Sequence, residues 1–335
     1  MFLVFRKRYL LLFFFFSSSL MGRVGEGLLF SQDTTINFFS PSSEFNNKRY
    51  VSVVAFQGLA YAGTIVQLSN TWYKDYYYHA SFHFFNDGNE WLQMDKAGHM
   101  LTSYYLGRMG IDMMEWSGAN QKKNILLGGT MGFAFLSTVE ILDGFSQGWG
   151  FSWGDFSANT IGSGLIIGKN LLQHKTAGSP LQRGGGAISL KFSFSQTDYP
   201  KYRPSLLGKN LTEQWLKDYN GQSYWMSFNI SSFFGVGRDF KSRLTFPKWL
   251  NVAFGYGAER MISGKPDFVY TDAQGNVIEF ERYRQYYLSL DIDLTRIKTR
   301  SHFLKTLFET IAFIKFPAPA LEMNKHGLKF HALYY

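Results

Sequence analysis

Apolar positions along the chain follow two different periods, one before and one after a short linker. Between about residues 50 and 174, apolar residues recur at helical spacing in long runs. Residues 175–186 are rich in Gly, Pro and Ser and interrupt this pattern. From 187 to 335, apolar and polar residues alternate. The sequence therefore predicts an α+β protein, in which a helical bundle (50–174) precedes an antiparallel β-region (187–335).

The helical part contains four apolar runs. The run "VSVVAFQGLAYAGTIVQLSN" (51–70) carries no charge over twenty residues. It is long enough to cross a bilayer or to lie inside a bundle, and the sequence does not separate these alternatives. The other runs lie at 91–109, 124–145 and 154–172. Glycines recur along the last two runs, which predicts closely packed helix backbones: Gly128, Gly129, Gly132, Gly162, Gly164 and Gly168.

The β-region alternates most clearly in "QYYLSLDIDLT" (285–295), where apolar residues face one way and Gln, Ser, Asp and Thr the other. The segments 187–196, 223–232, 249–259 and 327–335 show the same period. Alternation over about ten residues suits a transmembrane strand, with lipid on one side and a polar interior on the other. A soluble sandwich with one wet face alternates in the same way and is the alternative.

The number of strands limits the architecture. Five segments clearly show the strand pattern. The number rises to seven at most if weaker segments are added, at 267–271, 276–283 or 311–323. Closed single-chain barrels start at about eight strands. We therefore expect a small outer-membrane β-barrel or a partial barrel, with amphipathic helices at 203–219 and 301–313 between strands. The final Tyr335 resembles the terminal aromatic signal of bacterial outer-membrane β-proteins.

The N-terminus and the composition point to the cell envelope. Residues 1–31 combine a positive patch at positions 6–8 with a short apolar run, which predicts a cleaved export signal. Aromatic residues make up 19% of the chain and charged residues 18%, which fits a large lipid-facing or interfacial surface. The net charge of +9, without a recognisable nucleic-acid motif, favours anionic lipid headgroups over nucleic acid. The chain has no cysteine, so disulfides, thiolate metal sites and lipoprotein acylation are not expected.

Polar residues gather at helical spacing inside the apolar runs. Asp95 and His99 are four residues apart and share one helix face, as do Glu140 and Asp143, three apart. Charged groups in apolar helices are costly unless they are paired or functional. We therefore expect these side chains to converge with that of Asp155, a predicted helix N-cap, in the middle of the bundle.

Three interpretations of this constellation stay open. In the first, Lys96 and His99 neutralise the acids and the network sets the helix register. In the second, His99 binds a divalent metal with Glu140, Asp143 or Asp155, because imidazole and carboxylates form a reasonable ligand set. In the third, a histidine–carboxylate pair, for which Asp95 is also a candidate, acts as general acid and base on lipid or glycan. The spacing matches no strict metalloenzyme signature, and His79 and His83 are weaker ligand candidates.

Two quoted segments carry a resemblance to a known family. "DKAGHMLTSYYLGRM" (95–109) and "EILDGFSQGWGFSWGDFSANTIGSGL" (140–165) resemble the YfiM-like family of predicted periplasmic lipoproteins and, distantly, VanZ-like membrane proteins. The resemblance covers about residues 85–170 and implies no reaction, because the family is uncharacterised. The chain departs from it by lacking the lipoprotein cysteine. The motif positions here are Asp95, Lys96, His99, Glu140, Asp143, Gly144, Asp155, Asn159 and Gly162.

These observations predict an exported outer-membrane protein that is a structural or accessory subunit of an envelope assembly. Its expected partners are outer-membrane lipids and other outer-membrane proteins. The alternative is an envelope enzyme, dependent on a metal or on a histidine–carboxylate pair, that acts on lipid or glycan. A solute channel ranks third. It would need a continuous polar lumen lined by Asn229, Asp291 and Asp293, and the predicted strands are too few to enclose one.

Overall fold

The computed structural model describes residues 41–68, 80–175, 187–234 and 246–334. The predicted export signal, His79, Tyr335 and nearly all of the predicted linker lie outside the described residues. The chain divides into two compact units. We call them the helical unit (Met1–Asn86 and His99–Leu172) and the sheet unit (Asp87–Gly98 and Gln173–Tyr335).

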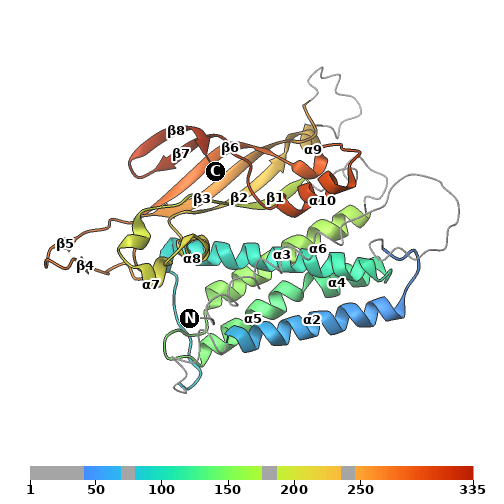
Figure 1. Ribbon diagram of the computed structural model, residues 1–335, viewed down its shortest axis with the longest axis horizontal. Coiled ribbons are helices and arrows are strands. Elements are labelled where there is room, and N and C mark those ends of the chain that lie inside the picture. The colour runs from blue at the N-terminus through green and yellow to red at the C-terminus, as the bar shows by residue number, and fades with distance from the viewer. Residues whose placement is uncertain (1–40, 69–79, 176–186, 235–245, 335) are drawn as a thin grey trace. The chain divides into compact units, whose positions relative to one another are not determined.

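The helical unit is built from long helices that run side by side (Figure 1). The predicted run 124–145 forms two helices instead of one, with a break at Thr130. Asn120 caps the first of these two by accepting hydrogen bonds from the backbone N–H groups of Lys122 and Lys123. The helices are α2 (Asn47–Leu68), α3 (Met94–Trp116), α4 (Gln121–Gly129), α5 (Met131–Gly144) and α6 (Trp153–Lys175).

Glycines bring the backbones of α3, α5 and α6 into contact. A Cβ atom added at Gly132 of α5 would lie 2.1 Å from the carbonyl oxygen of Ser103 in α3. One added at Gly162 of α6 would lie 2.2 Å from the carbonyl oxygen of Met100, also in α3. Only a residue without a side chain permits such an approach. The glycines of the sequence therefore allow two helices, α5 and α6, to pack against the same part of α3.

Apolar surface in the helical unit is divided between a core and exposed positions. Val53 of α2 packs with Met109, Met113 and Trp116 of α3. One stretch of the described chain, Gln121–Gly144, is long and apolar enough to cross a membrane by length and composition. It consists of α4 and α5, and 39% of its apolar window is buried. Helix α2 exposes a series of large apolar side chains: Val51, Val54, Phe56, Leu59 and Val66.

The sheet unit contains a six-stranded antiparallel sheet in the order β1-β2-β3-β6-β7-β8 (Figure 1). The described strands do not close into a barrel, since β1 and β8 are the two edges. Phe192 of β1 nevertheless forms a parallel bridge with Ile314, just before β7. The strands are β1 (Ile188–Phe194), β2 (Gln222–Asn229), β3 (Leu250–Glu259), β6 (Tyr283–Ile292), β7 (Ala318–Asn324) and β8 (Gly327–Tyr334), with a separate pair β4 (Tyr270–Thr271) and β5 (Val277–Ile278).

Short helices accompany the strands. The predicted amphipathic segment 203–219 forms two helices, and 301–313 forms one. Ser301 caps that helix by accepting a hydrogen bond from the backbone N–H of Leu304, at 3.3 Å. The helices are α7 (Pro204–Leu207), α8 (Leu211–Lys217), α9 (Ile230–Phe234) and α10 (His302–Ile311), and the 3₁₀ turns are η4 (Glu90–Gln93), η5 (Tyr199–Lys201) and η6 (Leu294–Arg296).

The strand register separates apolar from polar residues across the whole sheet. One cross-strand row contains only apolar side chains, and its neighbour on the opposite face contains only small or polar ones. Because successive residues of a strand point to opposite faces, the separation extends over all six strands. The apolar row is Leu190, Met226, Phe254, Leu288, Leu321 and Phe330; the other is Ser189, Ser227, Ala253, Ser289, Ala320 and His331.

The polar face of this sheet is buried and the apolar face is largely exposed. Phe254, Leu288 and Phe330 are 54%, 45% and 69% exposed, whereas Ser227 and Ser289 are 0% and 4% exposed. Tyr334 of β8 reaches across this face, since its hydroxyl lies 3.1 Å from that of Ser223 in β2, four strands away in the sheet. The sheet therefore curls around its polar face. A soluble antiparallel sheet with one wet face has the reverse arrangement.

Candidate functional site

The structure brings four of the predicted site residues together in the helical unit. His99 comes from α3, Glu140 from α5, and Asp155 and Asn159 from the first two turns of α6. His99 Nδ1 lies 3.1 Å from Asn159 Oδ1 and 3.7 Å from Glu140 Oε1. One possible ligand atom from each of His99, Glu140 and Asp155 lies within 4.8 Å of the others. We call these four residues the helical cluster.

Ser152 connects two members of the helical cluster through hydrogen bonds that the sequence pattern does not reveal. Its backbone N–H donates to Glu140 Oε2 at 3.4 Å. Its side-chain Oγ accepts from the backbone N–H of Asp155 at 3.1 Å, as a helix N-cap does. The cap thus belongs to Ser152 and not to Asp155. The capping serine sets where α6 begins, and hence where the Asp155 carboxylate lies.

A second pair of serines supports the same helices. The hydroxyl of Ser103 donates to the backbone oxygen of Asn159 at 2.7 Å and lies 3.0 Å from that of Ser163. Ser163 also accepts from the backbone N–H of Phe133 in α5, at 3.0 Å. Sequence reasoning missed both serines. Each stands four residues after a cluster member, which is the signal that could have found them.

The environment of the helical cluster is mostly dry, with one accessible member. The side chains of Glu140 and His99 are 3% and 24% exposed, respectively. Asn159 is completely buried, and its Nδ2 has no hydrogen-bond partner among the described residues. A buried amide without a partner costs about 1–3 kcal/mol. Imidazole and carboxylate oxygens together suit divalent ions such as Mn²⁺, Fe²⁺, Co²⁺ and Zn²⁺.

Asp143, which the sequence offers beside Glu140, does not belong to this group of ligand atoms. It is partly exposed one turn further along α5. Gly144, the next motif position, has a packing role, because a Cβ atom there would lie 2.3 Å from the ring of Phe82. Gly162 likewise allows α6 to approach α3.

Lys96 and Asp95 lie at the start of α3, in the sheet unit. Lys96 Nζ forms ion pairs of 2.8 Å with Asp87 and 3.1 Å with Asp95. Burial raises the pKa of Asp95, and the Lys96 ammonium opposes this shift. Asp95 Oδ1 has no hydrogen-bond partner among the described residues. Sequence reasoning missed Asp87, which precedes the helix in an irregular segment.

His83 acts as a loop anchor in the described structure. Its Nε2 lies 2.6 Å from the backbone oxygen of Trp149, and its Nδ1 lies 3.2 Å from that of Ser81. Its backbone N–H donates to the oxygen of Gly144 at 2.9 Å. These bonds attach the segment before α3 to the loop between α5 and α6.

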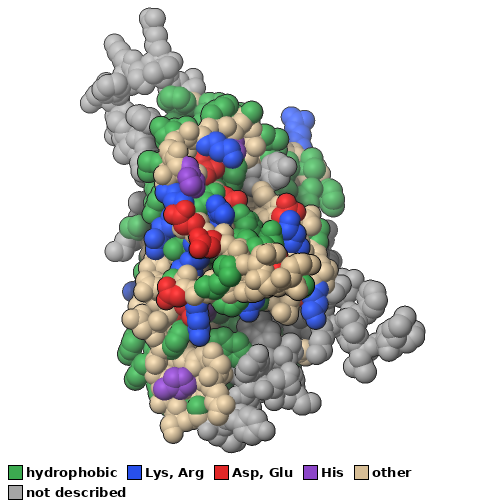
Figure 2. Space-filling view, turned by 90° about the vertical axis from the view of Figure 1, so that its left-hand side faces the viewer, with side chains coloured by type: hydrophobic (Ala, Val, Ile, Leu, Met, Phe, Trp, Pro, Cys, Tyr) green, Lys and Arg blue, Asp and Glu red, His purple; other side chains and the backbone are tan. Residues whose placement is uncertain are grey.

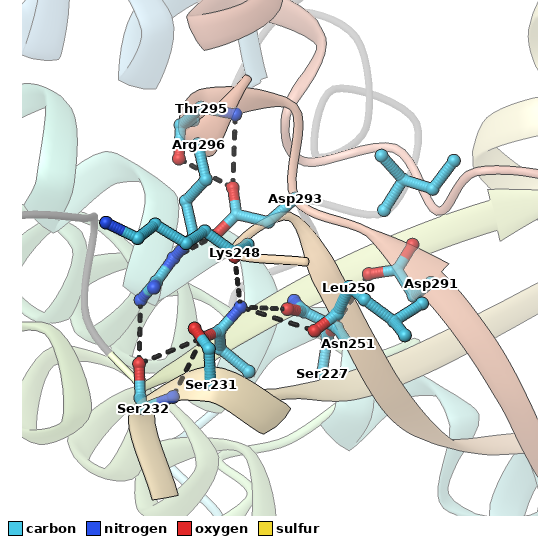
Figure 3. Close-up of polar contacts among 12 residues, drawn as sticks. Ser227, Ser231, Ser232, Lys248, Leu250, Asn251, Asp291, Asp293, Thr295 and Arg296 are labelled. Atoms are coloured by element: carbon cyan, nitrogen blue, oxygen red, sulfur yellow. Dashed lines mark hydrogen bonds and ion pairs between the residues drawn. The ribbon is translucent and has the colours of Figure 1, made fainter. Parts of the chain in front are cut away.

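The polar interior of the sheet contains a separate network, which includes the residues of the channel interpretation. Asp291 pairs with Lys191 at 2.7 Å and accepts from Ser227 Oγ at 2.6 Å. Asn229 donates to the oxygens of Lys248 and Asn251, both at 2.7 Å (Figure 3). Asn229, Asp291 and Asp293 are all buried. Hydrogen bonds and ion pairs therefore occupy the positions that the channel interpretation places along a lumen.

Comparison with known proteins yields one match. The model of a family described as predicted periplasmic lipoprotein (DUF2279) matches residues 83–170. No curated protein and no solved structure matches the chain. The matched segment contains all four residues of the helical cluster. It supports a lipoprotein-type family of the periplasm and does not single out the YfiM-like or VanZ-like groups.

Proposed function

We propose that this chain is an outer-membrane protein that serves as a structural or accessory subunit of an envelope assembly, with its sheet placed against lipid. The match to a predicted periplasmic lipoprotein family supports an envelope location. In this proposal residues 1–31 act as the export signal, and the matched segment is related to the YfiM-like group. In this proposal the sheet provides the attachment to the membrane.

The observation that carries the proposal is the exposed apolar face of a sheet whose polar face is buried. Nine large apolar side chains of β3, β6, β7 and β8 are between 41% and 70% exposed. Covering about half of each side chain is worth roughly 1 kcal/mol per residue, or on the order of 10 kcal/mol in all. A contiguous apolar surface of this kind marks a membrane or protein interface. The residues are Phe254, Tyr286, Leu288, Leu290, Leu321, Met323, Leu328, Phe330 and Leu333.

Charge and strand length favour a membrane-associated sheet over a pore. Strands β3 and β6 have ten residues each, which reaches the length of a spanning strand. Strands β1 and β7 have only seven. On the face drawn in Figure 2, hydrophobic side chains reach the surface between groups of charged ones. The net charge of +9 has the sign that anionic headgroups attract.

The edge strand β8 supports an accessory role. Within the described residues, β8 pairs only with β7. It presents Leu328, Phe330 and Leu333 at 60% to 70% exposure. An unpaired apolar edge is a template for another strand. In our proposal a strand of an outer-membrane partner pairs with this edge.

Cysteine scanning along β6 tests the lipid-facing surface, because the chain has no other thiol. Leu288→Cys and Leu290→Cys, labelled with an environment-sensitive dye in reconstituted vesicles, should be quenched by lipid-soluble quenchers and protected from aqueous ones. Ser289→Cys lies between them on the opposite, buried face and is the matched control, which should resist labelling. Gln274→Cys, in the exposed turn between β4 and β5, reports full aqueous quenching. Equal aqueous quenching at 274, 288 and 290 would refute the proposal.

The second candidate function is an envelope enzyme that acts on lipid or glycan through the helical cluster. The partly exposed His99 beside two buried carboxylates favours it. Loss of a lipid- or glycan-cleaving activity in His99→Ala, with unchanged unfolding, would favour the enzyme. A drop in thermal stability alone would favour the structural role.

A further inference from the structure

We propose that His99, Glu140 and Asp155 bind one divalent transition-metal ion, with Asn159 as a positioning residue. The inference is independent of the membrane placement of the sheet, because all four residues belong to the helical unit. It concerns binding and holds whether the ion stabilises the bundle or assists a reaction.

The spacing of the ligand atoms fits a single ion. Metal–ligand bonds to nitrogen and oxygen are about 2.0–2.2 Å long, so two ligands of one ion lie at most about 4.4 Å apart. The ligand atoms of His99, Glu140 and Asp155 lie within 4.8 Å of one another. Rotamer adjustments of a few tenths of an ångström close the remaining gap.

The backbones that carry the ligands are tightly constrained. Gly132 of α5 and Gly162 of α6 both lie against the backbone of α3, about two turns from Glu140 and Asp155 on their own helices. Ser103 and Ser163 add a hydrogen bond between α3 and α6. Sites of this kind are selective because the protein holds the ligands in place before the ion arrives.

Asn159 supplies an independent indication of a ligand. Its amide is completely buried beside His99, and one of its two polar atoms has no partner. As placed, Oδ1 faces the ring nitrogen of His99, and Nδ2 is left to donate to a water on the ion. A water bound to the ion would thus accept from the one polar atom of Asn159 that lacks a partner.

The donor set selects the class of ion. One nitrogen and two carboxylate ligands suit Mn²⁺, Fe²⁺, Co²⁺ or Zn²⁺, and the absence of cysteine removes competing thiolates. Three protein ligands leave at least one coordination position open for water or substrate. The exposed part of His99 provides access from solvent.

The test is metal binding to the full chain in detergent, purified with a tag that contains no histidine and stripped with a chelator. Zn²⁺ titration calorimetry should give about one site per chain, and Co²⁺ should develop the visible absorption of a nitrogen- and oxygen-ligated ion. Glu140→Gln, Asp155→Asn and His99→Ala should each weaken binding by at least about 10-fold, and Asn159→Ala by about 10-fold. Asp143→Asn, on the same helix as Glu140, is the matched control and should bind like the wild type.

Several outcomes would overturn the site. A folded wild-type chain, verified by near-ultraviolet circular dichroism, that binds neither Zn²⁺ nor Co²⁺ at micromolar concentration shows that the cluster is structural. Binding that survives all three ligand substitutions places the ion elsewhere. Because Glu140→Gln can disturb the buried hydrogen bond that Glu140 accepts from Ser152, the decision rests on Asp155→Asn, compared at equal helicity with Asp143→Asn. Failure of the lipid-quenching experiment on β6 would leave these outcomes unaffected.

Discussion

The buried ion pair between Lys191 and Asp291 allows a quantitative test of how the polar interior of the sheet is held together. Asp291 accepts from Lys191 Nζ at 2.7 Å, from Ser227 Oγ at 2.6 Å and from the backbone N–H of Phe316 at 3.2 Å. The two charged side chains are 2% and 0% exposed. The Lys191 ammonium therefore depends on Asp291 for the charge compensation that water would otherwise provide, and Asp291 also interacts with the buried Lys315.

Asp291→Ala should lower the free energy of unfolding by about 3–5 kcal/mol. The substitution leaves the Lys191 ammonium buried without its carboxylate, and removal of one partner of a buried pair costs that much. The double variant Lys191→Met/Asp291→Leu removes both charges and keeps most of the volume. Ser227 and the N–H of Phe316 still lose an acceptor, so this variant should lose about 1–3 kcal/mol. The double variant is thus expected to be more stable than Asp291→Ala.

Equilibrium urea unfolding of the full chain in detergent, followed by tryptophan fluorescence, measures these differences. Lys217→Ala is the control, because Lys217 pairs with Glu213 at 3.9 Å on the surface. Its effect should be about 0.5 kcal/mol or less. If Asp291→Ala costs no more than this control, the interior is hydrated and the reasoning fails. If the double variant is less stable than the single one, the ion pair contributes net stability in its own right.

Two further predictions concern the helices. Gly162→Ala should destabilise the chain by about 1–3 kcal/mol, because the new Cβ would lie 2.2 Å from the oxygen of Met100. Gly164→Ala, with nothing within 4 Å, should be neutral or stabilising by up to about 1 kcal/mol, and equal thermal melts for the two would contradict the packing. Burial raises the pKa of the Asp95 carboxyl above its ordinary value of 3.8. The protonated carboxyl therefore favours the folded state below pH 3.8, and this contribution is lost as the pH rises through the pKa of the folded state. Asp95→Asn should therefore raise the melting temperature at pH 7 relative to wild type and have little effect near pH 3, whereas an equal shift at both would show that desolvation of the charge is not the cause.

Membrane placement and metal binding can be separated experimentally, because they involve different residues. Labelling at position 288 or 290 reports on the apolar face of the sheet. Metal titration of Asp155→Asn reports on the helical unit. A chain that binds metal but shows no lipid contact would retain the metal site and refute the membrane-facing sheet. The reverse result would leave an outer-membrane protein whose polar cluster only sets the helix register.

Part of this architecture follows directly from the sequence. The change of period near residue 175 marks the passage from helices to strands, because side chains repeat about every 3.6 residues in a helix and every two in a strand. The alternation in 285–295 likewise places Leu288 and Leu290 on one face and Ser289 and Asp291 on the other. These are local properties, and no tertiary contact is needed to read them.

The choice between two carboxylates three residues apart needed the tertiary structure. Glu140 and Asp143 share a helix face in the sequence, yet only Glu140 lies with His99 and Asp155. The rotation of α5 about its axis decides this, and Gly132 lies on the side of α5 that contacts α3. Ser152, which links Glu140 to Asp155, comes from a loop without any period. Contacts of this kind join residues through space and leave no regular trace along the chain.

The burial of the polar face was also decided by the tertiary structure alone. The alternation of apolar and polar residues is the same in a sheet whose polar face meets water and in a sheet whose polar face is buried. The pattern determines which residues share a face, but not which face is enclosed. The curl that brings Tyr334 to Ser223 and the bridge from Phe192 to Ile314 enclose the polar side. Once water is excluded there, Lys191 and Asp291 must pair with each other, and the apolar side chains are left facing outward. The sequence determined which residues share a face, and long-range contacts between strands determined which face meets the surroundings.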